Sequence, residues 1–128
     1  MFITVGDKEV ELSTKLGVAA AIEKKFKMPL TQVFGRIGEA EIPELTGVLS
    51  IAAGKTSDPS FAGELLDNWD YIELQTSVQL LLAKLMFSGT HEQVESKLEK
   101  FPASDEGKNA IRELLGLPKL PSTSTASN

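Results

Sequence analysis

The stretch Met1–Phe26, MFITVGDKEVELSTKLGVAAAIEKKF, decides the expected fold because its hydrophobic period changes midway. Its first half alternates apolar and polar residues around a Gly-Asp turn, which predicts a β-hairpin over about residues 2–13. Its second half has a helical spacing, which predicts a helix over about residues 15–27. We expect the hydroxyls of Ser13 and Thr14 to cap the start of this helix. The chain therefore begins with a small hairpin followed directly by a helix.

The rest of the chain carries apolar residues at three- and four-residue steps, interrupted by proline and glycine, which predicts further helices. We expect these helices over Thr31 to Ile37, Pro43 to Gly54, Asp58 to Trp69, Tyr71 to Gly89, Thr90 to Phe101 and Ser104 to Gly116. Thr31, Asp58 and Thr90 are the expected caps of their helices, and Gly89 is expected to close its helix in a left-handed conformation. The predicted fold class is mainly α with a small N-terminal β-hairpin, in a compact bundle of five to seven helices.

Length and composition predict one domain followed by a tail. The chain has 128 residues, of which 41% are hydrophobic and 24% charged, as in ordinary globular proteins. We predict a single hairpin-plus-helices domain over residues 1–116. Residues 117–128 are rich in proline, serine and threonine and carry too few apolar side chains to offset the entropy of ordering. They are predicted to form a flexible tail.

The charge balance indicates which partners to expect. The formal net charge is −5, from 18 acidic and 13 basic residues, whereas phosphate binding needs a clustered cationic face. We therefore expect no nucleic-acid partner. The chain has no cysteine, no signal-peptide pattern and no apolar run long enough to span a bilayer. These features predict a soluble protein of the cytoplasm without a membrane partner.

Candidate catalytic and metal-binding residues are sparse. His91 is the only histidine, and no serine or aspartate with a catalytic spacing accompanies it. The stretch from Asp58 resembles a calcium loop, but Ala62 stands at its fifth position and Trp69 at its twelfth, where ligands are needed. The sequence thus predicts no catalytic residue, no metal and no cofactor. A small enzyme with an unrecognised carboxylate site stays an alternative.

Apolar surface is the remaining feature through which this chain could act. A two-stranded hairpin has unpaired backbone groups at its edges and needs packing support. We expect the face with Phe2 and Thr4 to pack on the helices, which leaves the other face and the edge for a partner or for self-association. The segment from Tyr71 to Gly89 is apolar over more than half of its circumference, so it is either the central helix or partly a contact surface.

Two stretches near the N-terminus, Thr4–Ser13 and Thr14–Glu23, resemble the start of tail assembly chaperones of long-tailed phages (siphoviruses) and gene transfer agents. Leu45–Gly54 and Tyr71–Gly89 are similar to the second and third helices of that family, so the likeness covers about residues 2–90. The resemblance implies a non-catalytic chaperone of the host cytoplasm. Its implied partner is the tape measure protein, with the major tail protein as a second candidate, before the tail tube polymerises.

Under this hypothesis the partner contacts come from apolar residues of the hairpin and from apolar residues beside the main stripe of the long helix. The candidate contact residues are Phe2, Val5, Val10, Leu12, Ile72, Met86 and Phe87. A homo-oligomer is also compatible with this surface. The alternative function is a structural component of the virion, such as a head–tail connector or completion protein, or another oligomerising helical adaptor.

Overall fold

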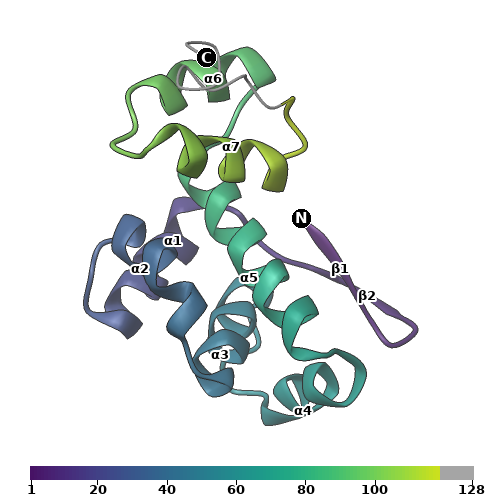
Figure 1. Ribbon diagram of the computed structural model, residues 1–128. Coiled ribbons are helices and arrows are strands. Elements are labelled where there is room, and N and C mark those ends of the chain that lie inside the picture. Colours follow the sequence, from purple (N-terminus) through teal and green to yellow (C-terminus); the bar gives the residue numbers. More distant parts are fainter. Residues whose placement is uncertain (119–128) are drawn as a thin grey trace. The chain divides into compact units, whose positions relative to one another are not determined.

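A computed structural model describes residues 1–118 and shows a mainly helical protein with an N-terminal hairpin (Figure 1). Over these residues the elements are β1 (Phe2–Val5), β2 (Lys8–Glu11), α1 (Leu16–Phe26), α2 (Leu30–Arg36), the 3₁₀ helix η1 (Ile37–Glu39), α3 (Ile42–Ala53), α4 (Pro59–Asn68), α5 (Tyr71–Met86), α6 (His91–Glu99) and α7 (Asp105–Leu114). The predicted fold class is confirmed. Within the predicted domain, the contacts form two units, one of residues 1–86 and one that begins at Phe87.

The hairpin pairs β1 with β2 in antiparallel register, with Val5 opposite Lys8 across the turn. Gly6 has a φ of 65°, a conformation that glycine adopts without strain. Ile3 and Val5 are buried, whereas Phe2 and Thr4 are exposed. The prediction that the Phe2 and Thr4 face packs on the helices was therefore wrong. Successive side chains of a strand point to opposite faces, so an error of one residue reverses the assignment.

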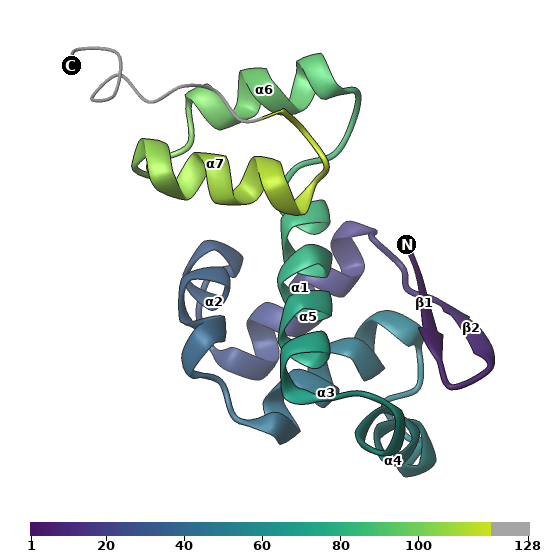
Figure 2. The ribbon, with the colours of Figure 1, turned by 45° about the vertical axis from the view of Figure 1, so that its right-hand side comes forward.

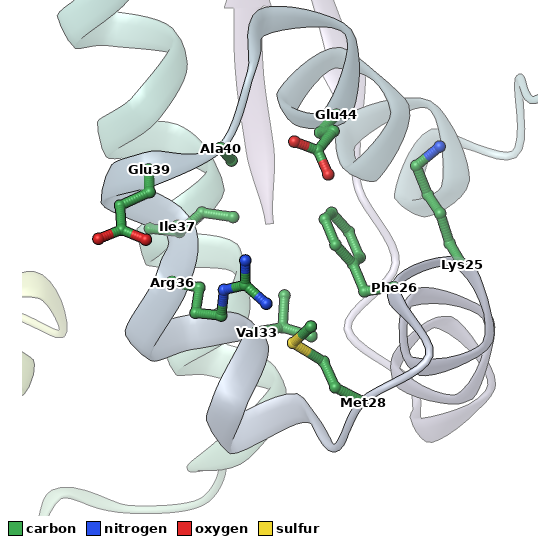
Figure 3. A pocket seen from close by; sticks show the side chains of 9 residues that line it. All are labelled: Lys25, Phe26, Met28, Val33, Arg36, Ile37, Glu39, Ala40 and Glu44. Carbon is green, nitrogen blue, oxygen red and sulfur yellow. The ribbon is translucent and has the colours of Figure 1, made fainter.

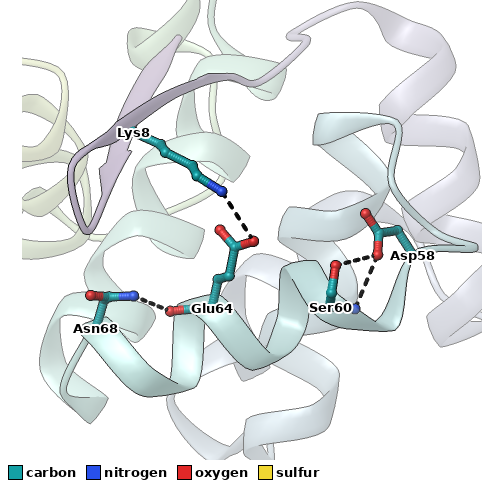
Figure 4. Close-up of polar contacts among 5 residues, drawn as sticks. All are labelled: Lys8, Asp58, Ser60, Glu64 and Asn68. Carbon is teal, nitrogen blue, oxygen red and sulfur yellow. Dashed lines mark hydrogen bonds and ion pairs between the residues drawn. The ribbon is translucent and has the colours of Figure 1, made fainter.

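Two contacts hold the hairpin against the C-terminal half of α4 and the residue that follows it. The indole Nε1–H of Trp69 donates to the carbonyl oxygen of Thr4 at 3.0 Å. The Lys8 ammonium lies 3.5 Å from the Glu64 carboxylate (Figure 4). Asn68 also lies close to the hairpin turn, because a Cβ atom added at Gly6 would lie 3.1 Å from Asn68 Oδ1. These contacts, with the buried β1 side chains, give the two strands the support that an isolated hairpin lacks.

The core of residues 1–86 is built around α5, which contacts α1, α2, α3 and η1 (Figure 2). The middle and end of α5 are apolar on several sides because helices cover several sides of it. The fully buried large side chains of this unit are Val5, Leu12, Ile22, Val33, Ile37, Leu45, Leu49, Leu65, Leu81 and Leu82. The central-helix interpretation of the segment from Tyr71 thus holds for most of its length.

Several predicted helix boundaries are confirmed. Asp58 caps α4 by accepting from the backbone N–H of Ser60 at 3.0 Å (Figure 4). Gly54 closes α3 with a φ of 71°. Thr90 and Gln93 form the predicted capping box of α6, in which each side chain accepts from the other residue's N–H. Each of these boundaries is set by residues close together in the sequence.

Three predicted caps were wrong. Neither Ser13 nor Thr14 caps α1, since Lys15 is its N-cap and makes no side-chain bond there. Thr31 lies inside α2, and the N–H of Leu30 before it donates to the Glu23 carboxylate at 2.8 Å, so α1 supplies the capping oxygen. Gly89 lies beyond the end of α5 at Met86. Its φ of 113° instead shapes the connection to α6.

The unit that begins at Phe87 is built from α6 and α7. The rings of Phe87 and Phe101 pack edge to face, with centroids 5.3 Å apart at 78°. Leu98 and Ile111 are buried between the helices. Ser104 caps α7 by accepting from the N–H of Gly107 at 3.1 Å. Two aromatic rings and a few aliphatic side chains make a small core of their own.

The predicted tail of residues 117–128 falls almost entirely beyond the part of the chain that the structure describes. Leu117 is buried, with 6% of its surface exposed. Residues 119–128 lie outside the described residues, and their flexibility stays a prediction. None of the helices between residues 1 and 118 has the length and hydropathy needed to cross a membrane.

Candidate partner-binding surface

Among residues 1–118, large apolar side chains reach the surface at six positions, all of them in residues 1–86. These are Phe2 (61% exposed), Leu16 (77%), Ile42 (42%), Leu66 (52%), Tyr71 (43%) and Ile72 (65%). Single exposed apolar residues are common in soluble proteins. Three of the six, Leu66, Tyr71 and Ile72, lie within seven residues of sequence, and we therefore consider this stretch as a candidate contact surface for another protein.

The seven residues predicted to contact a partner differ widely in exposure. Phe2 and Ile72 are exposed, as such a role requires. Val10 and Met86 are partly buried and pack against the core of residues 1–86. Three are buried and offer little surface to another chain: Val5 (2% exposed), Leu12 (1%) and Phe87 (5%). Val5 lies on the inner face of the hairpin, and Phe87 packs on Phe101. Binding at the exposed positions stays a prediction.

The sequence predictions named Phe2 and Ile72 but missed the other four exposed positions, which are Leu16, Ile42, Leu66 and Tyr71. Leu16 is the first residue of α1, and 77% of its surface is exposed. Leu66 follows the buried Leu65, and a step of one residue turns the side chain by about 100° on a helix. The neighbouring Leu65 was the signal that could have identified Leu66 as exposed, since adjacent residues do not share a helix face.

The end of α4 and the start of α5 form the most distinctive part of this surface. Leu66 belongs to the last turn of α4, Tyr71 and Ile72 belong to the first turn of α5, and two residues, Trp69 and Asp70, connect the helices. We call Leu66, Trp69, Tyr71 and Ile72 the α4–α5 corner. Trp69 is half-buried and packs against the core, so the corner is continuous with the folded interior.

Negative charge surrounds the α4–α5 corner. From Thr56 to Ala83 the sequence has five acidic residues and no lysine or arginine. Three exposed carboxylates, those of Asp67, Asp70 and Glu73, alternate with the corner residues along the chain. Asp70 Oδ1 accepts from the N–H of Glu73 at 2.8 Å, and Glu73 Oε1 accepts from the N–H of Asp70 at 3.3 Å. This reciprocal pair fixes the start of α5 and places both charges there.

A second candidate is a cavity of about 300 Å³ between α1, α2, η1 and α3 (Figure 3). Its apolar lining includes Phe26, Met28, Val33, Ile37 and Ala40, and charged side chains of both signs, Lys25, Arg36, Glu39 and Glu44, surround it. Glu44 also holds the start of α3, because its carboxylate accepts from the N–H of Glu41 at 3.0 Å. The cavity has room for one apolar side chain. Because charged residues of both signs surround it, it favours neither a basic nor an acidic partner.

His91 and Asp58 are the residues that the sequence offered for catalysis or metal binding. His91 is exposed in the first turn of α6. Hydrogen bonds from the Ser60 hydroxyl and backbone N–H lower the pKa of Asp58 below its ordinary value of 3.8, and the nearby Lys55 lowers it further. Within residues 1–118, no three His, Cys, Asp or Glu side chains are grouped so that they could hold a metal ion.

Comparison with protein families, with curated proteins and with solved structures found no match to this chain.

Proposed function

We propose that this protein is a non-catalytic tail assembly chaperone that binds the tape measure protein in the host cytoplasm. The observation that carries the proposal is the set of six exposed large apolar side chains on residues 1–86. The resemblance to tail assembly chaperones covers about residues 2–90, which is nearly the same segment. The major tail protein is a second partner under the same proposal.

The surface can serve this role because the core does not depend on it. The buried side chains of α3 and α5 hold the unit together, whereas Leu16 and Ile72 leave most of their surface exposed to water in the isolated chain. Covering one such side chain with a partner's apolar side chain contributes on the order of 1–2 kcal/mol. Several contacts of this size would hold a long helical partner in solution and still allow its release to the growing tube.

Co-expression with the tape measure protein tests the proposal. We expect the two proteins to copurify and the soluble fraction of the tape measure protein to rise several-fold over expression alone. A long helical protein from outside the phage, expressed with the same chain, is the matched control. If the tape measure protein neither copurifies nor becomes more soluble, the proposal is wrong.

A further inference from the structure

We infer that the α4–α5 corner is a docking site for an amphipathic helix whose apolar side is flanked by lysine or arginine. This inference rests on the proposed function, since it names the chemistry of the partner segment that the chaperone would select. It is carried by the exposed apolar side chains of the corner together with the charge around them.

The apolar part of the site comes from two helix ends that the chain keeps close together. Asn68 and Tyr71 are three residues apart, so their Cα atoms lie within about 11 Å of each other in any conformation. Leu66 is 52% exposed, Tyr71 43% and Ile72 65%. The next residues inward, Leu65 and Leu74, are buried and hold the two helix ends on the core. The inward residues Leu65 and Leu74 are thus more deeply packed than the exposed residues of the corner.

Charge selects the kind of helix that fits. Among residues 1–118, none of the carboxylates of Asp67, Asp70 and Glu73 forms an ion pair. No lysine or arginine lies between Thr56 and Ala83 in the sequence, and the hairpin cation Lys8 is paired with Glu64, so the charge of Asp67, Asp70 and Glu73 leaves the corner negative. A partner helix with lysine or arginine beside its apolar stripe gains attraction from all three carboxylates, whereas an acidic helix is repelled. A second copy of this chain, with its net charge of −5, meets the same overall repulsion.

The corner is also fixed before any partner arrives. The indole of Trp69 is held by its hydrogen bond to the carbonyl oxygen of Thr4. The first turn of α5 is fixed by the reciprocal bonds of Asp70 and Glu73. A site that is already ordered loses less entropy on binding, so the same contacts give a higher affinity.

Tryptophan fluorescence gives a direct test, because Trp69 is the single tryptophan of the chain and belongs to the corner. The probes are two synthetic helical peptides without tryptophan, with the same leucine stripe and with either lysine or glutamate on both flanks. We expect the lysine peptide to shift the Trp69 emission in a saturable way, with an affinity that falls as salt is added. We expect the glutamate peptide to have no effect at the same concentrations.

Matched variants of the full chain locate the site. Ile72→Ser removes an exposed apolar side chain of the corner, and Leu16→Ser removes one that is still more exposed but lies on α1. Losing the burial of one isoleucine side chain corresponds to about a tenfold weaker affinity. We expect I72S to weaken lysine-peptide binding about tenfold and L16S to leave it unchanged. Asp67→Asn is expected to weaken it severalfold, and the exposed Glu99→Gln on α6 is its control.

The outcomes separate the inference from the proposed function. Equal binding of the two peptides, equal losses in I72S and L16S, or a dimer of the free chain in sedimentation that I72S abolishes would each overturn the inference. Copurification of the tape measure protein that I72S and D67N leave unchanged would overturn it too, while the proposed function stands. If the lysine peptide binds as expected but the tape measure protein does not copurify, the proposed function is wrong and the docking chemistry stands.

Discussion

The ion pair between α6 and α7 predicts a difference in stability between two variants, because its two partners are buried to different degrees. The side chain of Arg112 is 6% exposed, and that of Glu95 is 30% exposed. The guanidinium donates to the two carboxylate oxygens of Glu95 at 2.7 and 3.0 Å and to Asn109 Oδ1 at 2.8 Å. Removing Glu95 leaves a buried cation without its opposite charge, whereas removing Arg112 leaves a carboxylate that already reaches water.

These burial values translate into unequal losses of the free energy of unfolding. Breaking a buried pair from one side costs about 3–5 kcal/mol, and the exposure of Glu95 places Glu95→Ala near the lower end, at about 3 kcal/mol. Arg112→Met keeps much of the packing of the aliphatic stem and removes the charge that is hard to bury, so we expect a loss of about 1 kcal/mol. The double variant should also lose about 1 kcal/mol, far from the sum of the single losses.

Urea unfolding of the full chain, followed by far-UV circular dichroism, measures these differences. Glu99→Ala on the exposed side of α6 is the control and should change stability by no more than about 0.5 kcal/mol. Equal losses for E95A and R112M, or a larger loss for R112M, would refute the reasoning that burial of the cation determines the energetics of this pair.

Three further predictions concern the backbone, a titrating cap and the core. Gly89→Ala forces a φ of 113° on an alanine, so it should lower the free energy of unfolding by about 1–3 kcal/mol in the same urea assay. Gly63 lies inside α4 with open space where a Cβ atom would be added, so Gly63→Ala should raise the free energy of unfolding by up to about 1 kcal/mol. Hydrogen bonds from Ser60 lower the pKa of Asp58, so its charge stabilises the fold at neutral pH and loses that effect as the pH falls below 3.8. The difference in urea midpoint between wild type and Asp58→Asn should therefore shrink in that range. A difference that stays constant with pH would contradict this prediction. Leu82→Ala creates a cavity at a fully buried position and should cost about 2–5 kcal/mol, and a loss below 1 kcal/mol would show that the site collapses freely.

The parts of the fold that sequence predicted well are those governed by local patterns. The hairpin turn, the glycine that ends α3 and the capping box of Thr90 and Gln93 are each set by residues within a few positions of one another. The caps that failed depend on distant residues. The N–H of Leu30 is satisfied by Glu23 from the preceding helix, a contact that spans seven residues and has no local signature.

The candidate surface was harder to predict because the exposure of a side chain depends on which face of its strand or helix the residue occupies. Leu12, Val5 and Ile72 are equally apolar in the sequence, but Val5 in β1 and Leu12 after β2 are buried, whereas Ile72 at the start of α5 is exposed. A one-residue error in a strand, or one position on a helix, changes which side chain faces the core. The acidic run around the corner, by contrast, is visible in the sequence, and reading it together with the helix ends would have drawn attention to residues 66–73.

The two interpretations of α5, central helix or contact surface, apply to different parts of the same helix. From Leu74 to Leu85 its stripe is buried and forms the core of residues 1–86, while Tyr71 and Ile72 in its first turn are exposed. Core and surface substitutions should therefore have separate effects. L82A should lower stability, and I72S should leave stability within about 0.5 kcal/mol while weakening the lysine peptide about tenfold. If I72S instead destabilised the chain as much as L82A, the first turn of α5 would belong to the core, and its exposure could not be the basis of partner binding.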